Sequence, residues 1–134
     1  TRHLSLALNK ADMLIGVSGA NLGTASTAAS MNRRSIIFAM ANPNPEIRPD
    51  LAKKAGVYIF ASGRSDIPNQ VNNALVFPGI FRGALDHKVK EITLAMLIKA
   101  AQNLASLVKN PTVKKIIPSI FDRGVVNAVA QAIK

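Results

Sequence analysis

Residues 35–61, SIIFAMANPNPEIRPDLAKKAGVYIFA, decide the fold of this chain. They open with a short, continuous apolar run over 35–41, which is typical of a strand covered on both faces. Two asparagine–proline pairs follow, and since neither continues a strand or begins a helix cheaply, residues 42–45 predict a fixed loop. A brief helix over 49–55 then leads to a second apolar strand over 57–61. The stretch therefore predicts one strand–helix–strand unit.

The segments on either side extend this pattern. Upstream, residues 4–10 predict the end of a helix, 13–18 another buried strand, and 24–31 a helix with Thr24 as its N-cap. Strands that alternate with helices over short connections are typical of a parallel sheet. From residue 71 onward the apolar spacing is helical, with helices predicted over 89–108 and 123–134. The fold class predicted is α/β, with about three parallel strands followed by C-terminal helices, in a single unit over 1–134.

The composition is that of a globular protein. Hydrophobic residues make up 49% of the 134 residues, enough for a buried core. No apolar stretch reaches the roughly 18 residues of a membrane span, and the N-terminal residues do not have the pattern of a signal peptide. The chain has no cysteine, which excludes disulfides and thiolate metal sites. These features predict a soluble, cytoplasmic protein without a membrane partner.

The formal net charge of +10 raises the question of nucleic-acid binding. However, the 17 basic residues are dispersed, and aromatic residues make up only 4% of the chain. No row of stacking side chains therefore accompanies the positive charge, and solvated helix faces explain it better than nucleic acid does. A third explanation is a larger protein whose acidic portion is absent, which a start at Thr1 instead of methionine fits.

A polar loop follows each of the three predicted strands. The loops are Ser18-Gly19-Ala20, the asparagine–proline loop over 42–45, and SGRSD over 62–66. Because ligands of open parallel sheets bind at the carboxyl ends of the strands, this coincidence predicts a binding site there. Strand ends also carry turn residues without any ligand, but Asn42 favours a site, since the proline after it restricts the asparagine backbone.

Four carboxamide side chains stand close together further along the chain, at Asn69, Gln70, Asn72 and Asn73. Carboxamides both donate and accept hydrogen bonds, so a cluster of them suits a small polar ligand. Asn72 and Asn73 precede an apolar helical run, where an asparagine can cap the free N–H groups. A cap needs one asparagine, which leaves the second for a ligand.

The ionisable residues predict structural roles. Arg64 with Asp66, and Arg82 with Asp86, stand at ion-pair spacing. The remaining acidic residues are too scattered along the chain to suggest a metal cage: Asp12, Glu46, Asp50, Glu91 and Asp122. No G-x-G-x-x-G motif occurs either. We therefore predict neither a catalytic group nor a metal ligand in this chain.

Several of these motifs together resemble one enzyme family. They are AD through IGVS over 11–18, FAMANP through PEI over 38–47, SGRSD through PNQVNN over 62–73, and FPGIFRGALD over 77–86. In this combination the chain closely resembles the C-terminal part of the NAD(P)-binding domain of bacterial-type malic enzymes. The resemblance implies a Rossmann-like, three-layer parallel sheet, of which this chain supplies the distal portion.

The resemblance also implies an activity and a site. Malic enzymes oxidise malate by hydride transfer to NAD or NADP, and then decarboxylate the bound oxaloacetate with the help of a divalent metal, Mg²⁺ or Mn²⁺, to give pyruvate. The implied cofactor contacts in this sequence are Val17, Ser18, Asn42 and Gly63. The implied contacts to malate are Asn42, Asn72 and Asn73.

The family's catalytic tyrosine and lysine, its metal ligands and its phosphate-binding loop precede the part matched here. Tyr58 lies inside a predicted strand and is no candidate for the catalytic tyrosine. We therefore expect the chain to be inactive alone and to act with the remainder of a malic enzyme, in a homo-oligomer. Two alternatives stay open: a malolactic-type relative, which yields lactate, and a non-catalytic basic α/β module that binds nucleic acid or a protein.

Overall fold

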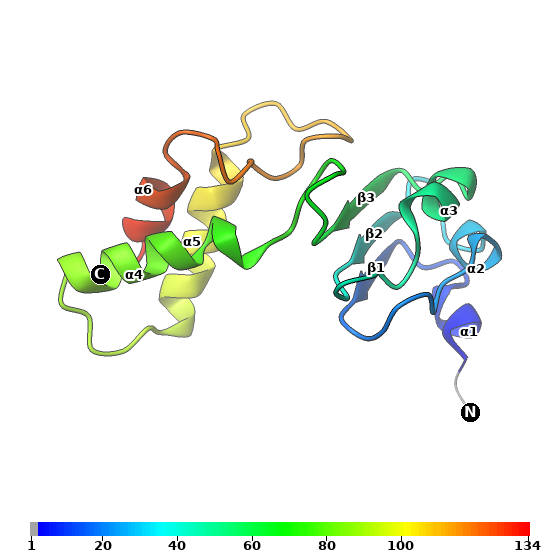
Figure 1. The fold of residues 1–134 in the computed structure, drawn as a ribbon, viewed down its shortest axis with the longest axis horizontal. Helices are drawn as coiled ribbons and strands as arrows, with labels where there is room; N and C mark the ends of the chain where they lie inside the picture. The colour runs from blue at the N-terminus through cyan, green and yellow to red at the C-terminus, as the bar shows by residue number, and fades with distance from the viewer. Residues whose placement is uncertain (1–2) are drawn as a thin grey trace. The chain divides into compact units, whose positions relative to one another are not determined.

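A computed structural model describes residues 3–134 of the chain (Figure 1). Contacts within the chain divide it into two compact units, Thr1–Val71 and Asn72–Lys134, which we call the sheet unit and the helical unit. The sequence predicted one unit, and that the two units belong to one domain stays a prediction. Of the helices in residues 3–134, none combines the length and apolar character that a membrane crossing needs.

The sheet unit contains three parallel strands, β1 (Met13–Gly16), β2 (Ile36–Ala39) and β3 (Ile59–Ser62), in that spatial order. The order and the parallel pairing confirm the predicted α/β class. Each strand is shorter or shifted relative to the prediction. β1 and β2 end before residues 18 and 41, the predicted strand ends, and the N–H groups of Ser18 and Ala41 bond to the Glu46 side chain instead of a neighbouring strand. β3 begins later because the backbone of residues 57–58 still bonds to the preceding turn and to Ser35.

Helices α1 (Leu4–Leu8), α2 (Ala25–Ala29) and α3 (Pro49–Lys54) cover one face of this sheet (Figure 1). The predicted cap of α2 is confirmed, since the Thr24 hydroxyl accepts a hydrogen bond from the Thr27 N–H at 3.2 Å. Alternate strand residues point toward the helices and join their apolar side chains in one core. The buried members of this core are Leu8, Ala28, Met31, Ile37, Ala39, Ile47 and Ala52.

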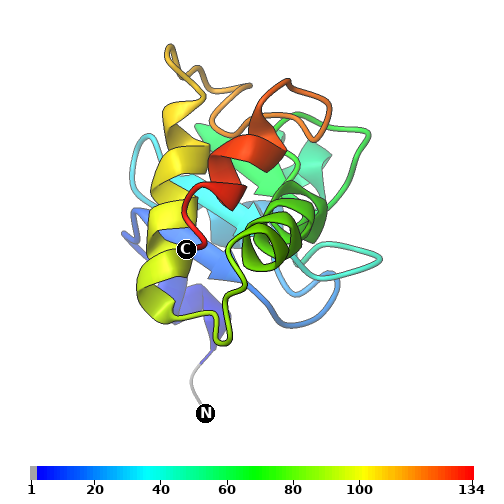
Figure 2. The ribbon, with the colours of Figure 1, turned by 90° about the vertical axis from the view of Figure 1, so that its left-hand side faces the viewer.

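The helical unit contains a short 3₁₀ helix, η1 (Asn73–Leu75), followed by α4 (Phe77–Asp86), α5 (Leu94–Ser106) and α6 (Val125–Ala130). Helix α6 packs against both α4 and α5, which Figure 2 shows from the side of these helices. The buried core of this unit consists of Leu75, Ile80, Ala100, Leu104, Val125, Val129, Ala132 and Ile133.

Two helices of this unit are shorter than predicted, and local backbone features explain both. Helix α5 begins at Leu94 instead of residue 89 because the Thr93 hydroxyl caps it, accepting from the Met96 N–H at 3.3 Å. Helix α6 begins only after Gly124, whose φ of 89° lies in the left-handed region that interrupts a right-handed helix.

Candidate functional site

The loops at the carboxyl ends of the three strands carry all four predicted cofactor contacts. Gly16, Ala39 and Ser62 are paired in register across the sheet, so the loops that follow them begin side by side. These loops carry Val17, Ser18, Asn42 and Gly63, which we call the carboxyl edge. Val17, Ser18 and Asn42 are exposed there, and Gly63 is half-buried. The structure thus brings these four residues to the edge where ligands of parallel sheets bind.

A buried carboxylate joins the first two loops of the carboxyl edge. Glu46 is only 2% exposed, and its Oε1 accepts a hydrogen bond from the Ser18 backbone N–H at 2.8 Å. The other oxygen, Oε2, accepts from the Ala41 N–H at 3.1 Å. The Ser18 hydroxyl also lies 3.4 Å from Oε1. One side chain therefore satisfies an N–H group in the loop after β1 and another in the loop after β2.

The backbone around Glu46 strengthens the same junction. The Gly23 N–H donates to the Glu46 carbonyl at 2.8 Å, and the Asn21 N–H donates to the Pro45 carbonyl at 3.1 Å. Gly16 leaves room for the carboxylate, because a Cβ at this position would lie 2.5 Å from the Glu46 carboxyl carbon. The loop after β1 is therefore fastened to the loop after β2 along several residues.

The surroundings of Glu46 keep its side chain ionised. Burial alone would raise the pKa of this carboxyl, but the N–H groups of Ser18 and Ala41 donate to it and favour the charged form. The balance holds the pKa of Glu46 below its ordinary value of 4.5. At neutral pH both oxygens are thus acceptors, as two N–H donors require.

The second and third loops of the edge meet at Asn42 and Gly63. The Asn42–Pro43 peptide is cis. A Cβ at Gly63 would lie 3.1 Å from the Asn42 Oδ1 and 3.6 Å from its Nδ2, so the amide group lies over the glycine. A residue with a side chain at position 63 would press on this amide. Glycine here keeps the amide and the backbone beneath it in contact.

The carboxamide cluster of the sequence separates into two groups with different roles. The Asn69 amide is buried and donates to the Phe60 carbonyl at 3.1 Å, while the Gln70 amide donates to the Gly63 carbonyl at 3.4 Å. Residue Gln70 also forms a parallel bridge with Ser62. Asn69 and Gln70 therefore belong to the scaffold of β3, contrary to the prediction that the whole cluster suits a ligand.

Asn72 and Asn73 lie at the start of the helical unit, and both are exposed. The Asn72 Oδ1 accepts from the Ala74 N–H at 2.9 Å and caps η1, as the sequence predicted for one of the pair. Because the oxygen of this amide is engaged, its two Nδ2 hydrogens remain as donors. Asn73 is the second asparagine, and within residues 3–134 its side chain has no hydrogen-bond partner.

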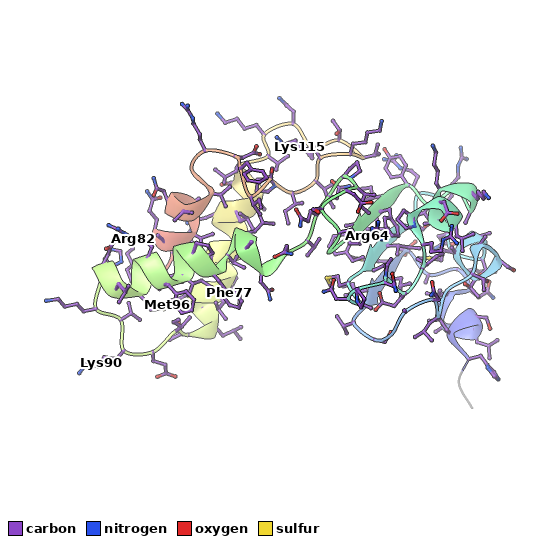
Figure 3. The ribbon with its side chains drawn as sticks, in the orientation of Figure 1. Arg64, Phe77, Arg82, Lys90, Met96 and Lys115 are labelled. Atoms are coloured by element: carbon purple, nitrogen blue, oxygen red, sulfur yellow. The ribbon has the colours of Figure 1, made fainter. Side chains whose placement is uncertain are left out.

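The predicted ion pairs are present. Arg64, labelled in Figure 3, forms two hydrogen bonds to Asp66 at 2.7 and 2.8 Å, which lower the pKa of that carboxyl. Arg82 bonds to Asp86 at 2.7 Å. A hollow of about 580 Å³ beside Arg64 is lined by none of the predicted site residues. Both of its arginines are paired with aspartates, so the hollow offers no free positive charge.

No metal centre is formed by the part of the chain that the structure describes. Within residues 3–134, no three side chains of His, Asp or Glu come together as a metal site requires. Glu46, the buried acidic residue, accepts hydrogen bonds from backbone N–H groups instead of binding a metal. That the metal ligands of the resembled family lie outside this chain stays a prediction.

Comparison with known proteins decides the family. Residues 5–134 match the sequence model described as "Malic enzyme, NAD binding domain". The chain belongs to this malic enzyme family. It is 51% identical over 125 residues to the bifunctional malic/malolactic enzyme of Bacillus subtilis, and 48% identical over 132 residues to the NAD-dependent malic enzyme of Geobacillus stearothermophilus. These matches cover 92% and 97% of this chain, but only 30% and 27% of the two relatives.

Solved malic enzyme structures agree. The crystal structure of the NAD-dependent malic enzyme from Thermotoga maritima superposes with a TM-score of 0.92 at 46% identity, covering 98% of this chain and 34% of that one. The malic enzyme from Pyrococcus horikoshii gives a TM-score of 0.89 at 47% identity, covering 97% and 30%. The chain thus spans about a third of the length of these relatives. The resemblance and the Rossmann-like class predicted from the sequence are confirmed.

The carboxyl edge of this malic enzyme domain suits a dinucleotide. It offers a serine hydroxyl and a carboxamide, which are neutral polar groups that can hydrogen-bond to a ligand at the strand ends. The sequence prediction missed Glu46, because it weighed acidic residues only as metal ligands. Its neighbours in the sequence, Pro45 and Ile47, give no signal of the contacts to Ser18 and Ala41.

Proposed function

We propose that this chain is the C-terminal part of the NAD(P)-binding domain of a malic enzyme, which converts malate to pyruvate and carbon dioxide while reducing NAD or NADP. The match of residues 5–134 to the malic enzyme family model carries the proposal. The gathering of Ser18, Asn42 and Gly63 at one sheet edge supports it. The remainder of the enzyme, in a homo-oligomer, is the proposed partner.

The residues of this chain would bind and orient. Val17, Ser18 and Gly63 line the path of the cofactor, and Asn42 lies beside both the nicotinamide and malate. The nicotinamide, when bound, supplies the acceptor for the hydride that leaves C2 of malate. Asn72 and Asn73 direct amide donors at a malate carboxylate. Neutral donors can orient a carboxylate and leave charge stabilisation to a divalent metal, Mg²⁺ or Mn²⁺, held by ligands outside this chain.

A replacement experiment tests this function. In the Thermotoga maritima malic enzyme, the segment that matches residues 5–134 is exchanged for this chain. We expect the chimera to reduce NAD or NADP when malate and Mn²⁺ are present, and the isolated chain to give no reduction under the same conditions. A chimera that folds, by its thermal melting curve, but does not oxidise malate would overturn the proposal. Malate oxidation by the isolated chain would overturn the assignment of the reacting groups to the rest of the enzyme.

A malolactic-type enzyme is the second candidate, because the Bacillus subtilis relative at 51% identity is described as a bifunctional malic/malolactic enzyme. Both activities begin with malate and the same kind of scaffold, but they differ in product. Chromatography of the chimera's products separates the two. Pyruvate with an equal amount of reduced cofactor supports the malic assignment, whereas lactate without net cofactor reduction supports the malolactic one.

A further inference from the structure

We propose that Glu46 is a positioning residue of the carboxyl edge: by joining the loop after β1 to the loop after β2, it sets where Ser18 and Asn42 stand toward the dinucleotide. This role rests on the proposed function of the edge. It extends that function to a buried residue that does not itself touch the cofactor.

The hydrogen bonds of Glu46 reach both predicted cofactor loops. Its Oε1 holds the backbone N–H of Ser18 at 2.8 Å, and its Oε2 holds the N–H of Ala41 at 3.1 Å. Ala41 directly precedes Asn42, so this bond fixes the backbone from which the Asn42 amide extends over Gly63. A shift of the carboxylate would therefore move a residue of each loop.

The neighbourhood leaves the carboxylate little freedom. It is 2% exposed, and the space next to it exists because Gly16 has no Cβ. Buried carboxylates are costly unless they are fully hydrogen-bonded, so this one is retained only where it satisfies N–H groups that no strand can pair. The N–H groups of Ser18 and Ala41 fit that description, because β1 and β2 have already ended.

The substitution Glu46→Gln tests this role with little change of shape. Glutamine offers one acceptor oxygen, so it can serve one N–H group but turns an amide donor toward the other. In the chimera described above, we expect the KM for the dinucleotide to rise about tenfold, as for one lost hydrogen bond to a charged group. In the isolated chain, we expect hydrogen exchange at the Ser18 or Ala41 amide to accelerate at least tenfold, measured by NMR.

Thr24→Ala is the matched control. It removes the α2 cap within the same unit, yet in residues 3–134 the Thr24 side chain hydrogen-bonds only to Thr27, and Thr24 lies outside the carboxyl edge. We expect this variant to lower the melting temperature of the chimera and to leave the KM for the dinucleotide unchanged. This comparison separates a general loss of stability from a displacement of Ser18 and Asn42.

The outcomes distinguish the two proposals. A folded parent chimera without malate oxidation would overturn the proposed function, and this role of Glu46 with it. An active parent whose KM for the dinucleotide is unaltered by Glu46→Gln would overturn the role of Glu46 alone. An equal rise of this KM in Thr24→Ala and Glu46→Gln would do the same, since both would then act through stability. A rise confined to Glu46→Gln, with faster exchange at Ser18 or Ala41, supports the role.

Discussion

The sheet unit and the helical unit differ in the side chains that they bury. In the described residues, the buried polar and charged side chains all belong to the sheet unit: Ser35, Glu46, Ser62 and Asn69. In the helical unit, glycines bring helices together instead. A Cβ at Gly79 would lie 2.5 Å from the Val129 Cβ, and one at Gly83 would lie 2.5 Å from the Ala130 carbonyl oxygen.

This difference separates residues that serve a site from residues that serve packing. A buried polar group lowers stability unless it is hydrogen-bonded, so its presence points to a geometry that apolar packing could not provide. Glu46, Ser62 and Asn69 all lie at the carboxyl ends of the strands or in the loops there. In the helical unit, Gly79 and Gly83 on α4 instead allow the close approach of α4 to α6 and the residues after it.

Gly83→Ala should destabilise the helical unit strongly. The added Cβ meets a backbone carbonyl oxygen at 2.5 Å and the Ile133 Cβ at 2.8 Å, and backbone cannot move aside cheaply. We expect a loss of about 3 kcal/mol in the free energy of unfolding, even though alanine favours helix over glycine by about 1 kcal/mol. Urea unfolding followed by circular dichroism at 222 nm measures it.

Gly19→Ala in the sheet unit is the control for that substitution. The nearest atom to a Cβ at this position is 4.0 Å away, which is ordinary contact. We expect its effect to stay within about 0.5 kcal/mol. If Gly83→Ala and Gly19→Ala unfold at the same urea concentration, close approach of α4 to α6 is not what holds the helical unit together.

Glu46 should make the stability of the sheet unit depend on pH in one direction. Because its pKa in the folded protein lies below the ordinary 4.5, its contribution is complete above that value. The contribution disappears as the pH falls through the folded pKa. At pH 7 we expect the parent chain to be about 2 kcal/mol more stable than Glu46→Gln, and the difference to vanish in acid.

Tyr58 provides the measurement. It is the single tyrosine of the chain, there is no tryptophan, and it lies in the sheet unit, so tyrosine fluorescence in urea follows that unit. The comparison between parent and Glu46→Gln cancels the titration of the other carboxylates, which both proteins share. A stability difference that stays constant from pH 7 to pH 3 would contradict the role assigned to the ionised carboxylate.

The sequence predicted the parts of this fold that depend on local pattern. The apolar runs around Ile37 and Ile15 marked parallel strands, Thr24 marked a helix start, and the polar loops marked the carboxyl ends. The strand ends were missed because the Glu46 side chain, 28 residues from Ser18 and five from Ala41, accepts the hydrogen bonds of their N–H groups. The periodicity of apolar residues carries no information about a hydrogen bond between a side chain and a loop backbone.

The carboxamide cluster shows the same limit within the site. Asn69 and Asn72 are the same residue type in one short segment. However, Asn69 is buried and donates to the Phe60 carbonyl, whereas Asn72 is exposed and caps η1. The difference arises from the bridge between Ser62 and Gln70, which draws residues 69–71 alongside β3. The composition predicted that amide side chains form hydrogen bonds in this segment. Only the backbone pairing shows which of these amides bond to the protein backbone itself.

Asn72 and Asn73 allow the finest test of the contrast between scaffold and site, because they are neighbours with different contacts. Asn72→Ala removes the cap on η1 and should lower the free energy of unfolding by about 0.5 to 1 kcal/mol. Asn73→Ala removes no side-chain hydrogen bond of the described residues and should change it by less than about 0.5 kcal/mol.

In the chimera, we expect Asn73→Ala to lower kcat/KM for malate about tenfold, since one amide donor to a carboxylate is lost. Steady-state kinetics beside urea unfolding separates the two effects. If Asn73→Ala leaves malate kinetics intact and Asn72→Ala impairs them beyond its effect on stability, the capping asparagine is also the malate contact, and its free Nδ2 donors explain how one residue can do both.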